Sequence, residues 1–195
     1  MKISTSMFYV ALAQAVLIPL GAMPAVAAPA NKPLTSMQSD IEIMGTGVAV
    51  GLPLIAAGVT YYKHDRAGLV QLAVETVLTV GTTYALKNIV REQRPDKSDW
   101  QSFPSGTTAL AASGSSFLWR RYGWQYGLPA FALSQFVSYS RVQANEHHWY
   151  DTLASSAIAI GYSYGITTPL KRRYNVNTGF SATPNGAYFQ MSYNF

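Results

Sequence analysis

Five apolar segments separated by short charged stretches constrain the fold of this chain more than any other feature. The segments are rich in Ala and Leu, contain few prolines, and are longer than most strands. Segments of this length and composition favour helices. The sequence therefore predicts an all-α helical bundle, with helices at about residues 41–62, 67–87, 107–119, 124–141 and 152–170.

The stretches between these segments hold most of the charged residues, which make up only 12% of the chain. That is about half the usual share, so any chemistry must depend on few charged groups. The chain has no cysteine, which excludes disulfides, thiolate metal sites and a cysteine nucleophile. A three-histidine metal centre would need every histidine: His64, His147 and His148. The net charge of +5 comes without an aromatic–basic motif and does not indicate nucleic-acid binding.

The first 27 residues are typical of a secretory signal peptide. Lys2 precedes an apolar run from Met7 to Met23, and Ala25-Val26-Ala27 provides small residues for cleavage. We expect a signal peptide at 1–27, a linker at 28–40, a helical domain at 41–173 and a tail at 174–195. This organisation predicts a periplasmic or secreted protein. The alternative is an uncleaved first helix and an inner-membrane location.

The tail differs from the rest of the chain, because apolar and polar residues alternate on both sides of Pro184-Asn185-Gly186. Alternation around an Asn-Gly pair predicts a short β-hairpin. One hairpin cannot close a barrel, so we expect the tail to pack on the bundle instead.

Two of the apolar segments, 41–62 and 67–86, are long enough to cross a membrane. Glu42 and Glu75 interrupt them, and the mean hydropathy of the whole chain is only +0.08. We therefore expect a soluble or membrane-associated bundle. A carboxylate facing lipid would be costly, so Glu75 should face another helix as a satisfied core carboxylate.

Three polar blocks lie at the ends of predicted helices and together suggest an anion site. Lys87, Arg94 and Arg141 are cations with few acids nearby, and they can neutralise a multiply charged anion. Ser105 and Gly106 precede an apolar helix, whose free backbone N–H groups favour a phosphate. His147 stands four residues before Asp151, a spacing at which the carboxylate can hold one ring nitrogen and leave the other free to attack.

The three blocks resemble the signature of the type 2 phosphatidic acid phosphatase superfamily, K-x6-R-P, P-S-G-H and S-R-x5-H-x3-D. The first block matches at Lys87 and Arg94-Pro95, and the third at Ser140-Arg141, His147 and Asp151. The resemblance implies that Lys87, Arg94, Arg141, Ser105 and Gly106 bind phosphate. It also implies that His147 forms a phosphohistidine and that Asp151 orients it, with no metal or other cofactor. Vanadate is then expected to inhibit as a phosphate mimic.

The second block departs from this signature, because Thr107 follows Pro104-Ser105-Gly106 where the family has histidine. In the family that histidine protonates the leaving group, which a threonine hydroxyl cannot do near neutral pH. We expect His148 and Glu146 not to replace it fully, because neighbouring side chains diverge on a helix. His64 lies at the far end of a helix, on the order of 30 Å away.

These features predict a phosphatase for phosphate monoesters or pyrophosphates carried on small molecules or lipids. Two alternatives stay open. A relative that binds phosphate or a lipid head group without catalysis is suggested by Thr107. An envelope protein with a structural role is suggested by the apolar helices and the aromatic tail. The oligomeric state is not readable from the sequence.

Overall fold

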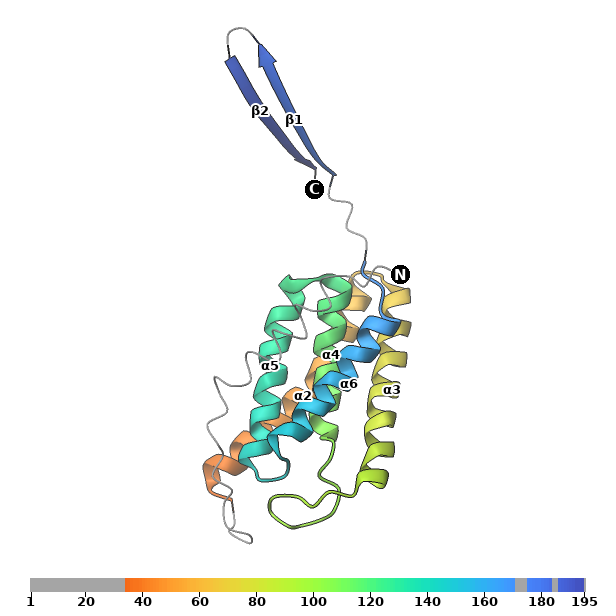
Figure 1. Ribbon diagram of the computed structural model, residues 1–195, viewed down its shortest axis with the longest axis vertical. Helices are drawn as coiled ribbons and strands as arrows, with labels where there is room; N and C mark the ends of the chain where they lie inside the picture. Colours follow the sequence, from red (N-terminus) through yellow and green to blue (C-terminus); the bar gives the residue numbers. More distant parts are fainter. Residues whose placement is uncertain (1–33, 171–174, 184–185, 195) are drawn as a thin grey trace.

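The computed structural model describes residues 34–170, 175–183 and 186–194 of the chain. Its main body is a bundle of five helices that run alternately up and down (Figure 1), as the sequence predicts. The predicted signal peptide at 1–27 and the first part of the linker lie outside the described residues. The helices are α2 (Ser36–Tyr62), α3 (Arg66–Val90), α4 (Gly106–Tyr122), α5 (Trp124–Gln143) and α6 (Trp149–Ile166).

Helix α2 begins at Ser36, inside the segment expected to be a linker, so the prediction for residues 36–40 is wrong. Thr35 caps the helix: its hydroxyl accepts from the backbone N–H of Gln38, and the Gln38 side chain accepts from the N–H of Thr35. This reciprocal capping box stabilises a helix start upstream of the apolar run. The other helix ends differ from the predicted ones by at most a few residues.

Helix α4 occupies the middle of the bundle and contacts each of the other four helices. Most of its residues are buried, and many of them are Ala, Ser or Gly. Small residues let the helix backbones approach closely. At Gly114, an added Cβ would lie 2.7 Å from the backbone of Leu52 in α2. The short, small-residue segment at 107–119 thus forms the centre of the fold.

The expectation for Glu75 is confirmed. Its side chain is fully buried in the middle of α3, where its carboxylate accepts hydrogen bonds from Ser116 in α4 and from Thr167 just after α6. The distances are 3.1 and 2.7 Å. These partners meet the hydrogen-bonding need that burial creates.

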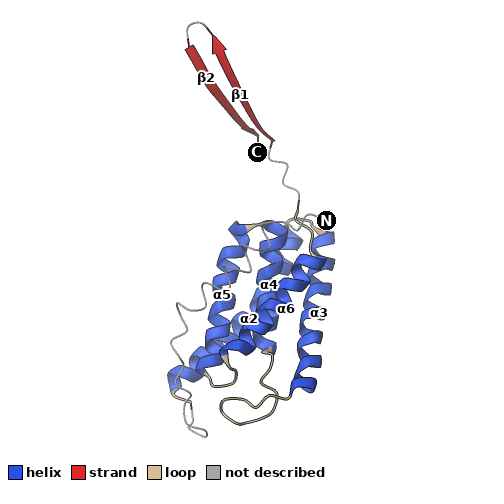
Figure 2. Cartoon of the chain, viewed as in Figure 1, coloured by secondary structure: helices blue, strands red, loops and turns tan. Residues whose placement is uncertain are grey.

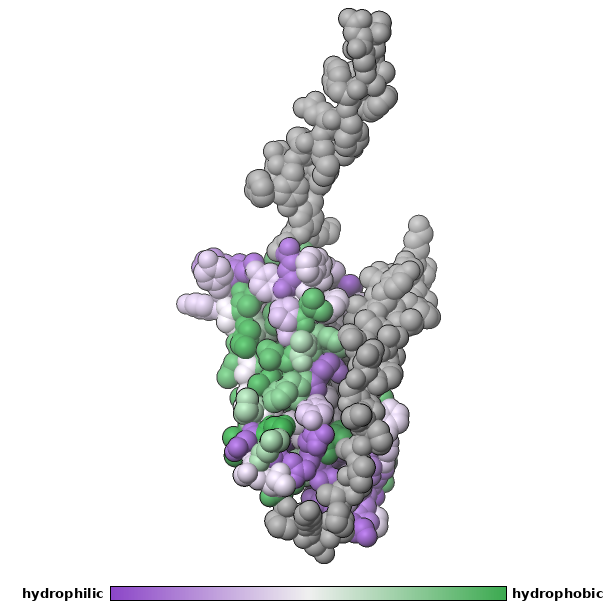
Figure 3. All heavy atoms as spheres, turned by 90° about the vertical axis from the view of Figure 1, so that its left-hand side faces the viewer, coloured by the Kyte–Doolittle hydropathy of each residue, from purple (hydrophilic) through white to green (hydrophobic). Residues whose placement is uncertain are grey.

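Helices α2 and α3 are long and apolar enough to cross a membrane. Their most apolar stretches of 18 residues have mean hydropathies of 1.8 and 1.3. Only 28% and 22% of these two stretches is buried inside the bundle, whereas a core helix of a soluble protein is mostly buried. Figure 3 shows hydrophobic residues gathered around the middle of one face, with hydrophilic residues toward both ends. The exposed apolar side chains of α2 and α3 include Ile43, Val50, Leu54, Ile55, Val70, Val74 and Val77.

The tail contains two antiparallel strands, β1 (Asn175–Thr183) and β2 (Gly186–Asn194), in which Thr183 pairs with Gly186 (Figure 2). The pairing agrees with the predicted hairpin. Pro184 and Asn185, the predicted turn residues, lie outside the described part of the chain.

Candidate active site

The three polar blocks meet at one end of the bundle, which we call the motif end (the lower end in Figure 1). Helices α3 and α5 finish there, and α4 and α6 begin there. The backbone N–H of Ser105 lies 3.4 Å from the carbonyl oxygen of Asp151, which joins the starts of α4 and α6. Residues 46 positions apart in sequence are therefore neighbours at this end.

His147 lies in the loop before α6, with a side chain that is only 3% exposed. Its Nδ1 is 2.8 Å from the carbonyl oxygen of Ser102 and 3.5 Å from Oδ2 of Asp151. A carbonyl oxygen only accepts hydrogen bonds, so Nδ1 carries the proton. In the neutral ring this leaves Nε2 with a free lone pair, as a nucleophile requires.

Asp151 lies in the first turn of α6 and is fully buried. Its Oδ2 accepts hydrogen bonds from the Ser102 hydroxyl at 2.5 Å and from the backbone N–H of His148 at 2.8 Å. Its other oxygen, Oδ1, has no hydrogen-bond partner among the described residues. The carboxylate is thus held rigidly on one side of the nucleophile while one of its oxygens stays unsatisfied.

Sequence reasoning missed Ser102. Its carbonyl oxygen receives the His147 proton and its hydroxyl donates to Asp151, so one residue fixes both members of the pair. It is fully buried in the loop between α3 and α4. Every residue has a backbone carbonyl, so the residue type does not reveal this role, and nothing in the local spacing identified this serine.

Lys87, in the last turn of α3, is the first of the predicted phosphate-binding cations. It is 7% exposed, and its Nζ donates to the carbonyl oxygen of Gln101 at 2.5 Å. A Cβ added to Gly106 would lie 3.8 Å from Cε of Lys87, so the lysine stem passes beside the start of α4. The structure thus brings the first and second blocks together.

Arg141 and Arg94 approach each other through one carboxylate, Glu146, a second residue that sequence reasoning did not include in the site. Nη1 of Arg141 lies 2.9 Å from Oε2 of Glu146, and Nη1 of Arg94 lies 3.7 Å from the same oxygen. Arg94 also donates to Asp99 at 2.9 Å, and Arg141 donates to the carbonyl oxygen of Glu42 at 2.6 Å. A carboxylate between two guanidinium groups occupies a position that suits an anion.

The second block forms the N-terminus of α4. The hydroxyl of Ser105 accepts from the backbone N–H of Thr108 at 3.3 Å and caps the helix, so its oxygen is already engaged. Gly106 and Thr107 are the first two residues of the helix and are partly exposed. Their N–H groups have no partner within the helix and face the end at which the cations gather.

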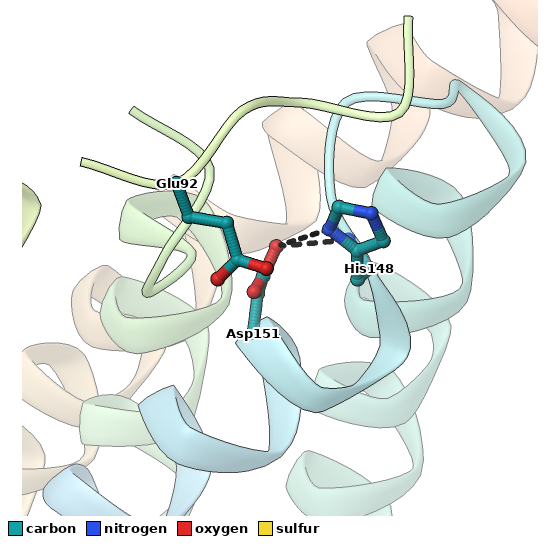
Figure 4. Close-up of side chains that lie close together, drawn as sticks. All are labelled: Glu92, His148 and Asp151. Carbon is teal, nitrogen blue, oxygen red and sulfur yellow. Dashed lines mark hydrogen bonds and ion pairs between the residues drawn. The ribbon is translucent and has the colours of Figure 1, made fainter. Parts of the chain in front are cut away.

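The expectation that His148 diverges from the nucleophile is wrong. His147 lies in the loop and His148 caps α6, so helical divergence does not apply to them. Nδ1 of His148 lies 3.6 Å from Oδ2 of Asp151, the same oxygen that His147 approaches. Its ring stacks on Tyr150, with centroids 4.9 Å apart, and Tyr150 donates to Glu92. Figure 4 shows His148, Asp151 and Glu92 converging.

Burial lowers the pKa of His147 below the usual range of histidine. The interaction with Asp151 opposes this shift, and the positive charges of Lys87 and Arg94 add to it. The net effect keeps the ring neutral, and its Nε2 nucleophilic, at pH values where an exposed histidine would be protonated. His64 is exposed at the opposite end of α3, as expected, and takes no part.

Comparison with known proteins gives one family and three relatives. The PAP2 superfamily matches residues 68–174. A lipid A 4'-phosphatase of Helicobacter pylori (strain J99) is 34% identical over 131 residues, which is 62% of this chain. The chain spans 66% of that relative's length. LpxE of Aquifex aeolicus has a similar fold, with a TM-score of 0.55 and 20% identity over 78% of this chain and 92% of its own. A transmembrane PAP2-type phosphatidylglycerolphosphate phosphatase of Bacillus subtilis is also similar (TM-score 0.47, 20% identity, 84% and 86% coverage).

Proposed function

This chain belongs to the PAP2 superfamily, and on that premise we propose that it hydrolyses phosphate monoesters or pyrophosphates carried on lipids. The observation that carries the proposal is the setting of His147. Its Nδ1 proton is held by the Ser102 carbonyl oxygen, which leaves Nε2 free on a ring that feels the positive charges of Lys87 and Arg94. That arrangement suits nucleophilic attack on phosphorus.

In the proposed reaction, Nε2 of His147 attacks phosphorus, and the bond to the leaving oxygen breaks with its electron pair on that oxygen. The ring gains positive charge, which the Ser102 carbonyl and the Asp151 carboxylate stabilise. Water then attacks the phosphohistidine, releases phosphate and returns the electron pair to Nε2. Ser102 and Asp151 thus position the ring and stabilise its charge through both steps.

Lys87, Arg94 and Arg141 would bind the phosphate oxygens, together with the backbone N–H groups at the start of α4. Charge on these oxygens rearranges in the transition state, so fixed cations there lower the barrier. The phosphate would compete with Glu146 for the two arginines, because that carboxylate lies between them.

Thr107 determines which leaving groups are tolerated. General acid catalysis typically contributes about 10²–10⁴ in rate, and a threonine hydroxyl does not supply it. Alkoxide leaving groups need a proton and should react slowly. Aryl phosphates and pyrophosphates need it less and should react faster.

We place the protein in a membrane, as an inner-membrane phosphatase with α2 and α3 in contact with lipid. The exposed apolar faces of these helices support this, and so does the similarity to a lipid A 4'-phosphatase. A lipid phosphate could then approach the motif end while its acyl chains stay in the bilayer. After a carbonate wash at high pH, the full chain should stay with the membrane fraction, and release into the supernatant would contradict this location.

A second function, phosphate or head-group binding without turnover, is favoured by Thr107 alone. The two functions are separated by hydrolysis assays of the full chain in detergent, beside His147→Ala, with an aryl phosphate, phosphatidic acid, a prenyl pyrophosphate and lipid A. Turnover that disappears in His147→Ala and is inhibited by vanadate supports the phosphatase. Phosphate binding with no turnover on any substrate supports the binding protein.

A further inference from the structure

Glu92, His148 and Asp151 form a cluster beside the nucleophile that the proposed reaction does not use as a unit. One ligand atom from each residue lies within 4.8 Å of the other two (Figure 4). Glu92 comes from the loop after α3, and the other two come from the start of α6. One imidazole nitrogen and two carboxylates form a ligand set that suits Zn²⁺ and similar divalent ions, with water completing the coordination.

An independent feature of Asp151 points to a ligand at this position. The residue is fully buried, yet its Oδ1 has no hydrogen-bond partner among the described residues. Leaving a buried charged oxygen unsatisfied is costly, and such atoms are rare in folded proteins. A cation bound through Oδ1 would satisfy it while Oδ2 keeps its hydrogen bonds to Ser102 and to the N–H of His148.

The other two ligands are accessible and already oriented. The His148 side chain is 32% exposed, so an ion can reach the cluster from solvent. Tyr150 stacks on the His148 ring and donates a hydrogen bond to Glu92, which fixes both side chains relative to each other. Contacts of this kind around metal ligands raise metal affinity.

We propose that Glu92, His148 and Asp151 bind one divalent cation of the Zn²⁺ type and that this cation inhibits turnover. The inhibition follows from charge: a dication on Asp151 opposes the positive charge that develops on His147 during attack. Cation binding stands on the cluster alone, whereas inhibition rests on the proposed function.

Binding is tested first, with Zn²⁺ itself as the probe and a fluorescent chelator as the competitor. The untagged full chain in detergent should bind one Zn²⁺, and Glu92→Gln and His148→Gln should each weaken binding at least about tenfold. Matched controls remove a carboxylate from the same loop, Asp96→Asn, and the exposed distant histidine, His64→Gln. Both controls should bind as the wild type does. No binding by the wild type, or equal loss in variants and controls, would overturn the site.

Inhibition is tested by hydrolysis of an aryl phosphate while Zn²⁺ is titrated. Wild-type turnover should fall as the site fills and return when a chelator is added. Glu92→Gln should match the wild type without zinc, because Glu92 does not contact the reacting atoms, and should need at least about tenfold more Zn²⁺ for inhibition. If the wild type binds zinc at full turnover, the inhibition is refuted. If turnover is absent even without zinc, the phosphatase fails while the binding experiment still decides the cation site.

Discussion

The two ends of the bundle carry similar residues but arrange them differently. At the end opposite the motif end, Arg121 and Asp65 form a closed pair: Nε and Nη2 of the arginine lie 2.7 and 2.6 Å from the two carboxylate oxygens. Nη1 donates to the carbonyl oxygen of Thr168 at 2.7 Å, and Tyr122 donates to the same carboxylate at 2.8 Å. Both charged side chains are only 6% exposed. Their charges cancel within the pair.

At the motif end, by contrast, the arginines form no bidentate pair among the described residues: Oε2 of Glu146 lies between Arg94 and Arg141, and Arg94 also makes a single contact with Asp99. Lys87 donates to a backbone carbonyl rather than to a carboxylate. The carboxylate contacts of these arginines are therefore single ones, made where the helices α4 and α6 begin, and a phosphate can compete for their donors. A cluster of charges at helix ends can thus bind an anion when its cations are not held in closed, bidentate pairs. A bidentate pair stabilises the fold, whereas cations in single contacts can exchange a carboxylate for a ligand.

Removing one arginine from each end gives the largest expected effects. Arg94→Ala should lower kcat/KM by about 10²–10³ with little change in thermal stability, because it removes one donor to the transferring phosphoryl group. Arg121→Ala should cost about 3–5 kcal/mol of stability, because it leaves Asp65 buried without its partner. Its turnover per folded molecule should stay unchanged. Both effects are measured by hydrolysis rates and thermal unfolding of the two variants in the same detergent. If Arg94→Ala lost stability and Arg121→Ala lost activity instead, the two ends would not divide function and stability between them.

Acid should weaken the opposite end in a defined range of pH. The hydrogen bonds from Arg121 lower the pKa of Asp65 to about 2, whereas an unperturbed aspartate has a pKa near ~3.9. A lowered pKa in the folded state means that the stabilisation is complete above about pH 4 and is lost as the pH falls toward 2. The pair should contribute roughly 2 kcal/mol through this shift.

Asp65→Asn measures this contribution, because asparagine still caps α3 but carries no charge. The difference in unfolding temperature between the wild type and Asp65→Asn should be largest above pH 4 and should shrink as the pH falls to 2. A difference that does not change with pH would show that the charge of Asp65 contributes nothing.

The helices were predictable because the length of each apolar segment and the charged stretches between the segments can both be read from the sequence. The start of α2 was not, because the capping box of Thr35 and Gln38 precedes the apolar run that reveals the helix. The exposed apolar surface was also underestimated. Mean hydropathy averages over the whole chain, whereas α2 and α3 concentrate their apolar side chains on outer faces.

At the site, motif spacing predicted which blocks meet, but not the contacts inside them. Ser102 acts through its carbonyl oxygen, a group that every residue has. Glu146 and His148 were judged by helical geometry, although residues 144–148 form a loop in which neighbouring side chains can point the same way. Loop conformation depends on tertiary contacts, and for that reason the local sequence could not give it.

Placing a histidine at position 107 tests whether this position of the motif end reaches the leaving group. Thr107→His should raise kcat on alkyl phosphates at least about tenfold and change kcat on aryl phosphates little, because only poor leaving groups need the proton. An unchanged ratio of alkyl to aryl rates would mean that position 107 does not reach the leaving group.

The pH profile of kcat/KM reports on His147. In the wild type, its acid limb should lie below about pH 6.5, since burial lowers the pKa of His147 and the ring loses its lone pair only when protonated. Thr107→His should add a falling limb at high pH, where the new histidine loses its proton.

The smallest expected effect comes from Glu146, the carboxylate between the two arginines. Glu146→Gln keeps its size and removes one negative charge, so phosphate and vanadate should bind about threefold more tightly and KM should fall, while kcat changes little. The gain is modest because Glu146 is 25% exposed and solvent screens its charge. Raising the ionic strength should reduce the difference between variant and wild type, since salt screens partly exposed charges. If KM rises instead, Glu146 holds Arg94 and Arg141 in place for the substrate rather than competing with it. The motif end would then resemble the opposite end, because both would need their carboxylate.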